Sequence, residues 1–530
     1  MRVTTTALGC LRRGRFPAAL VVLLLALAAA ESGPSSSSAP PDLVLVLADD
    51  LGYGDVGFNG APSIKTPSLD RLTREGARLT SVYGEPLCSP GRAALLTGRA
   101  AQRGGVYTSA PPPVDEFFRV FYPSSTGCLS KDAPTIAETL KGVGYATAMV
   151  GKWHLGSAPG CLPADRGFDS WLGMPYSHEE GYPGPAPESL VWPPTPLMEG
   201  HGEIVTQPFN SSTLTATYTQ RVLEALADDS PSQAPLFLHL AFEQPHVPLF
   251  VSPDFEGKSR RGAFGDAVEE MDSVMGVLAD RLRARAAFPA QRQALLVFAS
   301  DNGAWTTAGN GIGSNEGAIP AFDGGSNLPF RDQKGTTWEG GVRVPALAWW
   351  PGTVPAATVR AAHVGFVDIA ATLLTAGGAA LEGVEGVDLR PWLVGTAPDE
   401  PPRPQQFLWR ENRLHAVRAG ALKAHFITRS GWDLGDFGTY HDPPLLFDVE
   451  RDPAESTPLD PTLYAAELAA MVGAAAANNA SMLPLPPSQL EGQDWADVPC
   501  CDSGFDVREA AELLRAGEVG PAIWDNCVCF

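Results

Sequence analysis

Basic residues are scarce in this 530-residue chain. It has 38 lysine and arginine residues against 60 aspartate and glutamate residues, which gives a net charge of −22. We therefore do not expect the broad basic face with which proteins bind nucleic acids or other polyanions. An anionic ligand would have to be bound by a local cluster of cations. Only 18% of the residues are charged and 44% are apolar, which excludes a disordered protein, and the length predicts two or three domains.

Long apolar runs are equally scarce. The one candidate is Ala18–Ala30, which follows four arginines and ends in small residues. A run of 13 residues is too short to cross a bilayer of roughly 30 Å as a helix, so it predicts a cleaved signal peptide over residues 1–30, with an uncleaved anchor as the alternative. A flexible leader follows at residues 31–41. With no other spanning segment, and with sequons at Asn210 and Asn479, the sequence predicts a secretory-pathway protein, lysosomal or extracellular.

The chain has only eight cysteines, and Cys10 leaves with the signal peptide. Seven then remain, an odd number for an oxidising compartment, so one of them is expected to be unpaired or chemically altered. Two bridges in the C-terminal tail and a third between Cys128 and Cys161 would leave Cys88 as the odd residue; the tail cysteines are Cys500, Cys501, Cys527 and Cys529. A zinc site in the tail is the alternative, which adjacent cysteines suit poorly.

Short apolar runs alternate with helical stretches through most of the chain. The runs have few polar positions, which is typical of strands buried on both faces. They are Leu43–Ala48, Ala146–Val150, Leu236–Phe242, Leu295–Ala299 and Val344–Trp350. Helical periodicity with capping signals marks Thr66–Gly76, Ala133–Gly142 and Leu214–Asp228. This alternation predicts an α/β fold with a large, mainly parallel sheet flanked by helices.

The pattern changes at about residue 400, after the proline-rich segment Pro398–Pro404. Shorter, alternating runs predict a small antiparallel sheet, and they are Phe407–Trp409, Leu414–Val417 and Leu422–Phe426. Ala465–Ala477 then predicts one helix. We therefore expect a large domain over residues 42–400 and a C-terminal antiparallel-sheet domain with a disulfide-bonded tail over residues 401–530.

Polar residues follow four of the apolar runs at the point where each run ends. They are Asp49 and Asp50, Lys152 and His154, His246, and Asp301 and Asn302. Ligands of parallel sheets bind outside the carboxyl ends of the strands, so these side chains are expected to meet in one crevice. Each pair alone has a plainer interpretation as a turn or helix cap. Their recurrence at four strand ends favours a functional site.

Cys88 opens a segment, CSPGRAALLTG, that is typical of the start of a helix. Pro90 suits the first helical turn, and Ala93–Leu96 continue the helix. Cys88 would then lie at a helix N-terminus, where free backbone N–H groups and the helix dipole stabilise an anion. Arg92, one turn further on, could bind an oxyanion through its guanidinium group. A buried or bridged cysteine is the alternative interpretation.

Five segments resemble the type I sulfatases of the alkaline-phosphatase-like superfamily, in particular the arylsulfatase A and N-acetylgalactosamine-6-sulfatase branches. They are ADDLGYGD (48–55), CSPGRAALLTGR (88–99), GYATAMVGKWHLG (144–156), SDNG (300–303) and KGTTWEGG (334–341). The resemblance implies an enzyme that hydrolyses an aryl, sugar or glycolipid sulfate ester. It also implies that a formylglycine-generating enzyme oxidises Cys88 to Cα-formylglycine, whose hydrated gem-diol attacks sulfur. Many family members carry serine where this chain has Gly91.

The resemblance further implies a metal site built from Asp49, Asp50, Cys88, Asp301 and Asn302. Carboxylate and amide oxygens suit a hard cation, so Ca²⁺ is expected, with Mg²⁺ as the alternative.

The same resemblance assigns the catalytic roles. Arg92 would orient the diol, Asp301 would accept its proton, and His154 would act as the base that expels sulfate. The sulfate group would be bound by Lys152, Ser177, His246 and Lys334, and either His246 or Lys334 would protonate the departing alcohol. Two other functions stay open: a related phosphoester or phosphonate hydrolase, and a non-catalytic relative that binds sulfated ligands. A homo-oligomer is compatible with each of these functions.

Overall fold

The computed structural model describes the chain from residue 40 onward, with gaps. The described residues are 40–109, 119–181, 192–227, 233–287, 292–307, 324–430, 438–502, 504–516, 520, 523–524 and 527–529. The predicted signal peptide, Cys10 and nearly all of the predicted leader lie outside the described residues. Among the helices of the described ranges, none combines the length and the apolar character that crossing a membrane requires.

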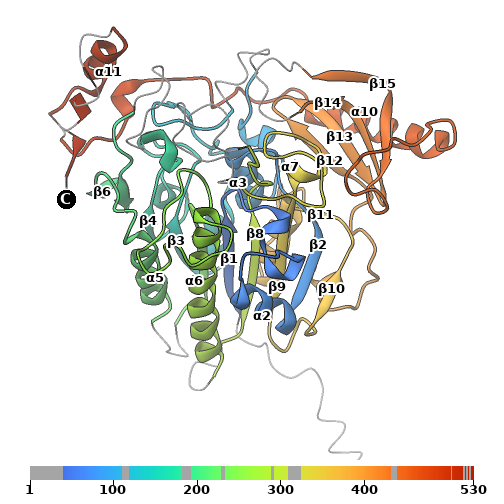
Figure 1. Cartoon of the computed structure of the whole chain (residues 1–530), viewed down its shortest axis with the longest axis horizontal. Coiled ribbons are helices and arrows are strands. Elements are labelled where there is room, and N and C mark those ends of the chain that lie inside the picture. The colour runs from blue at the N-terminus through green and yellow to red at the C-terminus, as the bar shows by residue number, and fades with distance from the viewer. Residues whose placement is uncertain are drawn as a thin grey trace, which may run out of the picture. The chain divides into compact units, whose positions relative to one another are not determined.

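An eleven-stranded sheet contains all five strands that the sequence predicts, each within one residue of its predicted ends (Figure 1). The strand order is β10-β2-β9-β8-β1-β7-β3-β4-β5-β6, with β11 beside β2. β1 pairs in parallel with β7 and β8, and β3 pairs in parallel with β7, whereas β9 runs antiparallel to β8 and β2. The strands are β1 Asp42–Ala48, β2 Ala77–Tyr83, β3 Ala146–Gly151, β4 Ser170–Gly173, β5 Leu197–Glu199, β6 Glu203–Thr206, β7 Leu236–Ala241, β8 Ala294–Ser300, β9 Arg343–Trp349, β10 Thr358–Arg360 and β11 Val364–Gly365.

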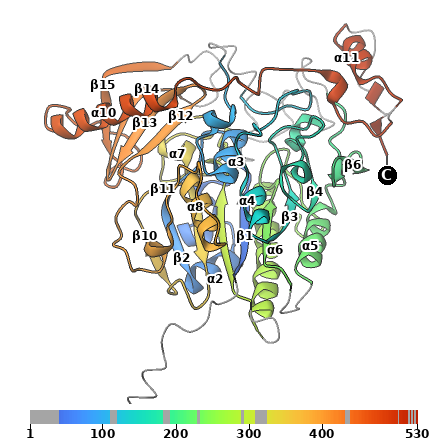
Figure 2. The same ribbon diagram turned by 180° about the vertical axis from the view of Figure 1, so that it is seen from behind.

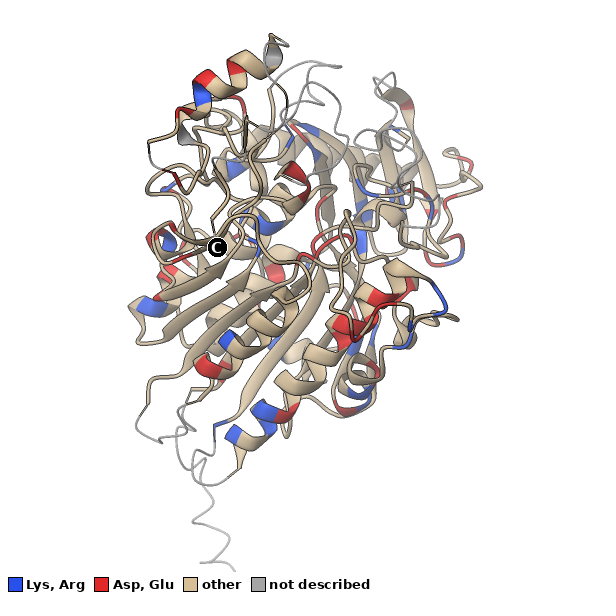
Figure 3. Cartoon of the chain, turned by 60° about the vertical axis from the view of Figure 1, so that its left-hand side comes forward, with Lys and Arg blue, Asp and Glu red and all other residues tan. Residues whose placement is uncertain are grey.

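Helices cover both faces of this sheet and bury it in two hydrophobic cores. The side chains of β1 alternate between the cores: Leu45 belongs to one and Val46 to the other, and both are fully buried. α2 (Pro67–Glu75), α5 (Leu214–Ala225) and α6 (Ala263–Ala286) lie on the face seen in Figure 1, whereas α3 (Cys88–Thr97), α4 (Ile136–Gly142) and α8 (Phe366–Ala376) lie on the face seen in Figure 2. Charged residues occur mainly on helices and loops, and the strands of the sheet are almost free of them (Figure 3). The predicted α/β sheet flanked by helices is therefore confirmed.

A second, four-stranded sheet follows in the C-terminal part of the chain. Its strands β12 (Gln406–Arg410), β13 (Arg413–Ala419), β14 (Leu422–Thr428) and β15 (Thr439–Asp448) pair in sequence order and are all antiparallel. Helix α10 (Ala465–Met482) packs on this sheet, with Leu468 and Met471 in the same apolar cluster as Val417. The predicted antiparallel sheet and helix are confirmed, and the placement of a domain boundary at residue 400 stays a prediction.

The cysteines form fewer bridges than the sequence predicts. Cys128–Cys161 is present as expected, and one bridge of the tail joins Cys500 to Cys527. Cys501 and Cys529 are free thiols that hydrogen-bond to each other, so the second expected bridge of the tail is not formed. Both residues lie beside Gln207, which exchanges backbone hydrogen bonds with Cys529 and accepts one at its side chain from Cys501.

Candidate active site

The residues expected at the strand ends meet at one edge of the large sheet. Asp49 and Asp50 follow β1, Lys152 and His154 follow β3, His246 follows β7, and Asp301 and Asn302 follow β8. Cys88 and Arg92 come from α3, Ser177 from the loop after β4, and Lys334 from the loop before α7 (Glu339–Val342). All eleven of these residues are buried, and none exposes more than 4% of its surface. The structure therefore brings these side chains together, whereas their membership of a catalytic site and their chemical roles stay predictions.

Two site residues have a backbone conformation that residues other than glycine rarely adopt. Asp50 and His154 lie in the left-handed region, with φ values of 62° and 61°. Gly151, at the end of β3, has a φ of 104°, and a Cβ atom there would lie 1.7 Å from the carbonyl oxygen of Ala241. Only glycine fits this position, and it lets the chain turn sharply and direct Lys152 into the site. Strained backbone of this kind is typical of functional sites.

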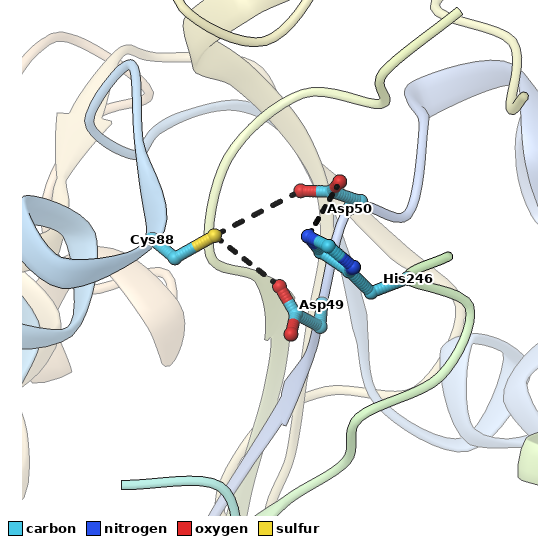
Figure 4. A group of neighbouring side chains, drawn as sticks. All are labelled: Asp49, Asp50, Cys88 and His246. Carbon is cyan, nitrogen blue, oxygen red and sulfur yellow. Dashed lines mark hydrogen bonds and ion pairs between the residues drawn. The ribbon is translucent and has the colours of Figure 1, made fainter. Parts of the chain in front are cut away.

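Cys88 is a buried free thiol at the first position of α3. Its Sγ atom lies 3.4 Å from Asp49 Oδ1 and 4.0 Å from Asp50 Oδ1 (Figure 4). Burial, together with the negative charges of Asp301 and Asp49, raises the pKa of Cys88 well above its ordinary value. The unmodified side chain is therefore a neutral thiol, which is a weak nucleophile.

Oxygen atoms gather around this thiol in a way that suits a metal ion. Ligand atoms of Asp49, Asp50, Cys88 and His246 all lie within 4.8 Å of one another (Figure 4). Asp301 Oδ1 accepts a hydrogen bond from the Asp50 backbone at 3.2 Å. Asn302 donates from Nδ2 to Asp50 at 2.7 Å, while its buried Oδ1 atom has no hydrogen-bond partner. A buried amide oxygen without a partner is costly, and a cation bound among these oxygens would satisfy it.

Three cations are held against these carboxylates. Arg92 donates from Nε and Nη2 to Asp301 Oδ2 at 3.2 and 3.0 Å. Lys152 forms an ion pair with Asp49. Lys334 lies 2.8 Å from the carboxylate of Asp50. These cations hold the pKa of Asp49 well below its usual range, although burial alone would raise it.

The cations do not fully offset the effect of burial on Asp301. Burial and the neighbouring charge of Asp49 raise the pKa of Asp301 to about 7, in spite of its contact with Arg92. A carboxylate with a pKa in this range can accept a proton and release it again near neutral pH.

Both histidines of the site are neutral, and their hydrogen bonds fix which ring nitrogen carries the proton. His154 Nε2 lies 3.0 Å from the carbonyl oxygen of Phe121, which can only accept, so Nε2 donates and the buried Nδ1 is left without a partner. His246 Nδ1 donates to the carbonyl oxygen of Val247 at 2.5 Å, and its Nε2 accepts from Lys334 at 3.0 Å. Burial and neighbouring cations lower the pKa values of both rings well below the ordinary value. Each neutral ring therefore has one nitrogen without a proton, which is Nδ1 in His154 and Nε2 in His246.

Ser177 lies where the resemblance implies, with its Oγ atom 3.3 Å from Lys152 Nζ. Two further residues, which the sequence did not single out, lie beside the site. Glu179 Oε1 lies 3.8 Å from His246 Nε2, and the ring of Trp305 lies 6.4 Å from the His246 ring. The only signals in the sequence are positions: Glu179 lies two residues after Ser177, and Trp305 lies three residues after Asn302.

The small sheet holds the segment that carries Lys334. Arg410 on β12 donates to the carbonyl oxygen of Gly335 at 2.8 Å. Lys423 on β14 lies 2.9 Å from Glu339 Oε1, and Glu455 accepts the backbone N–H of Glu339 at 2.7 Å. C-terminal residues thus anchor this segment at two points, Gly335 directly after Lys334 and Glu339 at the start of α7.

Comparison with protein-family models gives two matches along the chain. The first is to the model described as "Sulfatase", over residues 41–379. The second is to the "C-terminal region of aryl-sulfatase", over residues 401–509. Together these matches cover both sheets.

Curated relatives agree with these matches. The chain is 37% identical to human arylsulfatase A over 451 residues, which is 79% of this chain and 83% of that protein. It is 36% identical to mouse N-acetylgalactosamine-6-sulfatase over 450 residues, which is 79% of this chain and 82% of that protein.

Solved structures show the same fold. PsFucS1 sulfatase from Pseudoalteromonas sp. superimposes with a TM-score of 0.72 at 26% identity, over 89% of this chain and 94% of that one. The phosphonate monoester hydrolase SpPMH from Silicibacter pomeroyi superimposes with a TM-score of 0.55 at 15% identity, over 85% of this chain and 97% of that one. At that identity, the likeness to the phosphonate hydrolase shows the fold alone.

Proposed function

The chain belongs to the sulfatase family and is a sulfuric ester hydrolase; we propose that it acts through a formylglycine made from Cys88 and a bound Ca²⁺ ion, on an aryl, sugar or glycolipid sulfate ester. One observation carries this proposal. Cys88 is buried at the N-terminus of α3, with Sγ 3.4 Å from Asp49, beside carboxylates that pair with Lys152 and Lys334. A neutral thiol is a weak nucleophile, whereas the hydrated aldehyde of a formylglycine would supply a hydroxyl group that can attack sulfur.

The proposed cation ligands are Asp49, Asp50, Asp301 and Asn302, beside residue 88. All four offer oxygen atoms, as Ca²⁺ and Mg²⁺ require and zinc does not. The partnerless Oδ1 atom of Asn302 supports the fit. A bound cation would supply positive charge next to a sulfate oxygen and the nucleophilic hydroxyl group.

The proposed proton transfers use groups already in position. Asp301 would accept the proton of the attacking hydroxyl group, and Arg92 would hold that carboxylate in place through its two hydrogen bonds. His154, whose Nδ1 atom has no partner, would accept the second proton when sulfate leaves residue 88.

The proposed sulfate site comprises Lys152, Ser177, His246 and Lys334. Attack on a sulfate ester builds negative charge on the sulfuryl oxygens and on the departing alcohol oxygen, and buried cations fixed beforehand stabilise that charge. Lys334 already donates to His246 Nε2 at 3.0 Å. We therefore assign proton delivery to the alcohol to this pair.

The experiment that tests the proposal examines Cys88 directly. Cleavage by trypsin after Arg78 and Arg92 releases residues 79–92, and conversion to formylglycine lowers the mass of this peptide by about 18 Da. The same sample is assayed for sulfate release from 4-nitrophenyl sulfate, with 4-nitrophenyl phosphate alongside. We expect the converted peptide, sulfate release, and a Cys88→Ser variant that folds but loses several orders of magnitude in rate. Full activity with Cys88 wholly unconverted would contradict the mechanism, and faster phosphate release would favour the phosphoester alternative.

We further place the protein in the secretory pathway, lysosomal or extracellular, where a formylglycine-generating enzyme would act on the chain. The exposed positions of Asn210 and Asn479 and the Cys128–Cys161 bridge support this placement. Removal of N-glycans from protein secreted by cultured cells should increase its gel mobility. Replacement of both asparagines by glutamine should abolish that change.

A further inference from the structure

Glu179 is a carboxylate beside the proposed sulfate site that the mechanism does not use. It lies on a short 3₁₀ helix, η6 (His178–Gly181), with Oε1 3.8 Å from His246 Nε2. Its side chain is 36% exposed, whereas the side chain of His246 is 1% exposed. Glu179 is therefore a solvent-exposed neighbour of the buried ring to which we assign proton delivery.

The backbone that carries Glu179 is fixed by its neighbours. The buried His178 side chain contacts the carbonyl oxygen of Pro248 at 3.0 Å, and the His178 carbonyl accepts from Thr195 at 3.2 Å. A Cβ atom on Gly181 would lie 2.4 Å from the backbone of Pro193, so the helix end packs directly against that segment. The backbone on both sides of Glu179 is thus held in place by packing.

An indole ring lies near the same histidine. Trp305 is partly exposed, and its ring centre lies 6.4 Å from that of His246 and 5.7 Å from Lys334 Nζ. The combination of an aromatic ring and a carboxylate suits a hydroxyl-bearing ring, because the ring packs against the indole while a hydroxyl group donates to the carboxylate.

We propose that Glu179 and Trp305 bind the alcohol part of the ester and select a singly sulfated, otherwise uncharged sugar ring. This inference rests on the proposed hydrolysis of sulfate esters. A hydroxyl group next to the sulfate would donate to Glu179, whereas a second sulfate or a carboxylate at that position would be repelled by it. Glu179 is thus a specificity-determining residue, and polyanionic sulfated chains are poor substrates.

The test compares substrates that differ in one group. The substrates are a methyl hexoside monosulfate, the same hexoside with a second sulfate on the neighbouring carbon, and the monosulfate that lacks the neighbouring hydroxyl group. Sulfate release by the mature enzyme gives kcat/KM for each. The variants are Glu179→Gln, which keeps the hydrogen-bond acceptor, and Glu179→Ala, which removes it. Glu467→Gln, at an exposed glutamate on α10, is the matched control.

We expect the wild-type enzyme to prefer the monosulfate over the disulfate by about tenfold or more, and this ratio should shrink at high salt. Glu179→Gln should abolish most of that preference while keeping the preference for the hydroxyl-bearing substrate. Glu179→Ala should abolish both preferences, and Glu467→Gln neither. The comparison uses ratios of kcat/KM between substrates for the same variant. An effect of Glu179 on His246 that is common to all substrates cancels in these ratios.

The inference is overturned if Glu179→Gln changes kcat/KM for all three substrates by the same factor, because Glu179 would then act only through His246. It is also overturned if the wild-type enzyme prefers the disulfate. If the wild-type enzyme releases sulfate from 4-nitrophenyl sulfate but from none of the hexosides, the choice of a sugar ring is wrong while the proposed function stands. If no sulfate is released from any ester, the proposed function itself fails.

Discussion

Lys423 connects the small sheet to the segment that carries Lys334, and its replacement by methionine should lower both stability and turnover. The Lys423 side chain is fully buried, with Nζ 2.9 Å from Glu339 Oε1 and 3.2 Å from Glu455 Oε1. Methionine keeps most of the side-chain volume but removes the charge. Two buried carboxylates then lose the ammonium group that compensates them, and Glu339 lies only five residues after Lys334.

The expected magnitude follows from these contacts. Removing one partner of a buried ion pair typically costs about 3–5 kcal/mol, because the other charge stays buried. Glu339 keeps its hydrogen bond from Tyr83 and its ion pair with Arg343, so we expect the lower end, about 3 kcal/mol. A shift of Lys334 by about 1 Å would lower kcat/KM by roughly 10²-fold.

Urea unfolding and sulfate release, both measured at a temperature where each variant is fully folded, check this expectation. Met471→Ala is the matched control, since it opens a cavity between α10 and the small sheet at a cost of about 2–5 kcal/mol without removing a contact to the Lys334 segment. It should keep the wild-type kcat/KM. The reasoning is refuted if Lys423→Met also keeps it, or if Met471→Ala loses as much activity as Lys423→Met.

The pH dependence of unfolding stability gives a second test of the ion pair between Lys423 and Glu339. Burial alone would raise the pKa of Glu339, but Lys423, Arg343 and Arg418 hold it well below the ordinary value of 4.5. A depressed pKa in the folded state stabilises the protein above the unfolded-state value, and this stability is lost as pH falls through the folded-state pKa. The stability difference between the wild type and Lys423→Met should therefore be full at pH 7 and narrow below pH 4.5. A difference that widens on acidification would contradict this assignment.

Three further expectations can be checked with the same assays. Lys334→Ala should lower kcat/KM by roughly 10²–10³-fold, as for other fixed charge stabilisers, while the exposed Lys65→Ala changes nothing; an unchanged rate would remove Lys334 from the site. Gly91→Ser introduces a Cβ atom 2.6 Å from the carbonyl oxygen of Asp301, so it should cost about 1–3 kcal/mol and lower turnover without reducing formylglycine content by mass spectrometry. A variant as stable and active as the wild type would show that α3 adjusts freely. Dialysis against a calcium chelator should abolish sulfate release and lower the unfolding temperature. Adding Ca²⁺ should restore both. Full activity after exhaustive chelation would exclude the proposed metal site.

The central strands could be predicted because they are buried on both faces. β1 and β8 are continuous apolar runs, and such runs stand out in any sequence. β2 was missed because its sequence, ARLTSVY, mixes charged and polar residues with apolar ones. α8 was missed for the opposite reason: eight of its eleven residues are buried, which leaves no polar face to give a helical period.

The sequence predicted those site residues that directly follow a recognisable buried strand. Asp49 and Asp301 stand directly after buried strands, so the topology of a parallel sheet brings them together. Glu179 lies six residues after β4, a short strand that the sequence did not indicate, and only the folded chain places it beside His246. The contact between Glu339 and Lys423 joins residues 84 positions apart, and nothing in either local sequence indicates the other.

A count of formal charges connects the site to its substrate. Counted in their ionised forms, three buried carboxylates balance three buried cations, and the histidines are neutral; the residues counted are Asp49, Asp50, Asp301, Arg92, Lys152 and Lys334. A divalent cation and a singly charged ester would bring the total to +1, an excess that is available to the negative charge developing on the departing oxygen. Glu179, counted as ionised, brings the total back to zero. A substrate with a second anion would make the total negative, so the charges of the buried site and of Glu179 favour the same singly charged ester.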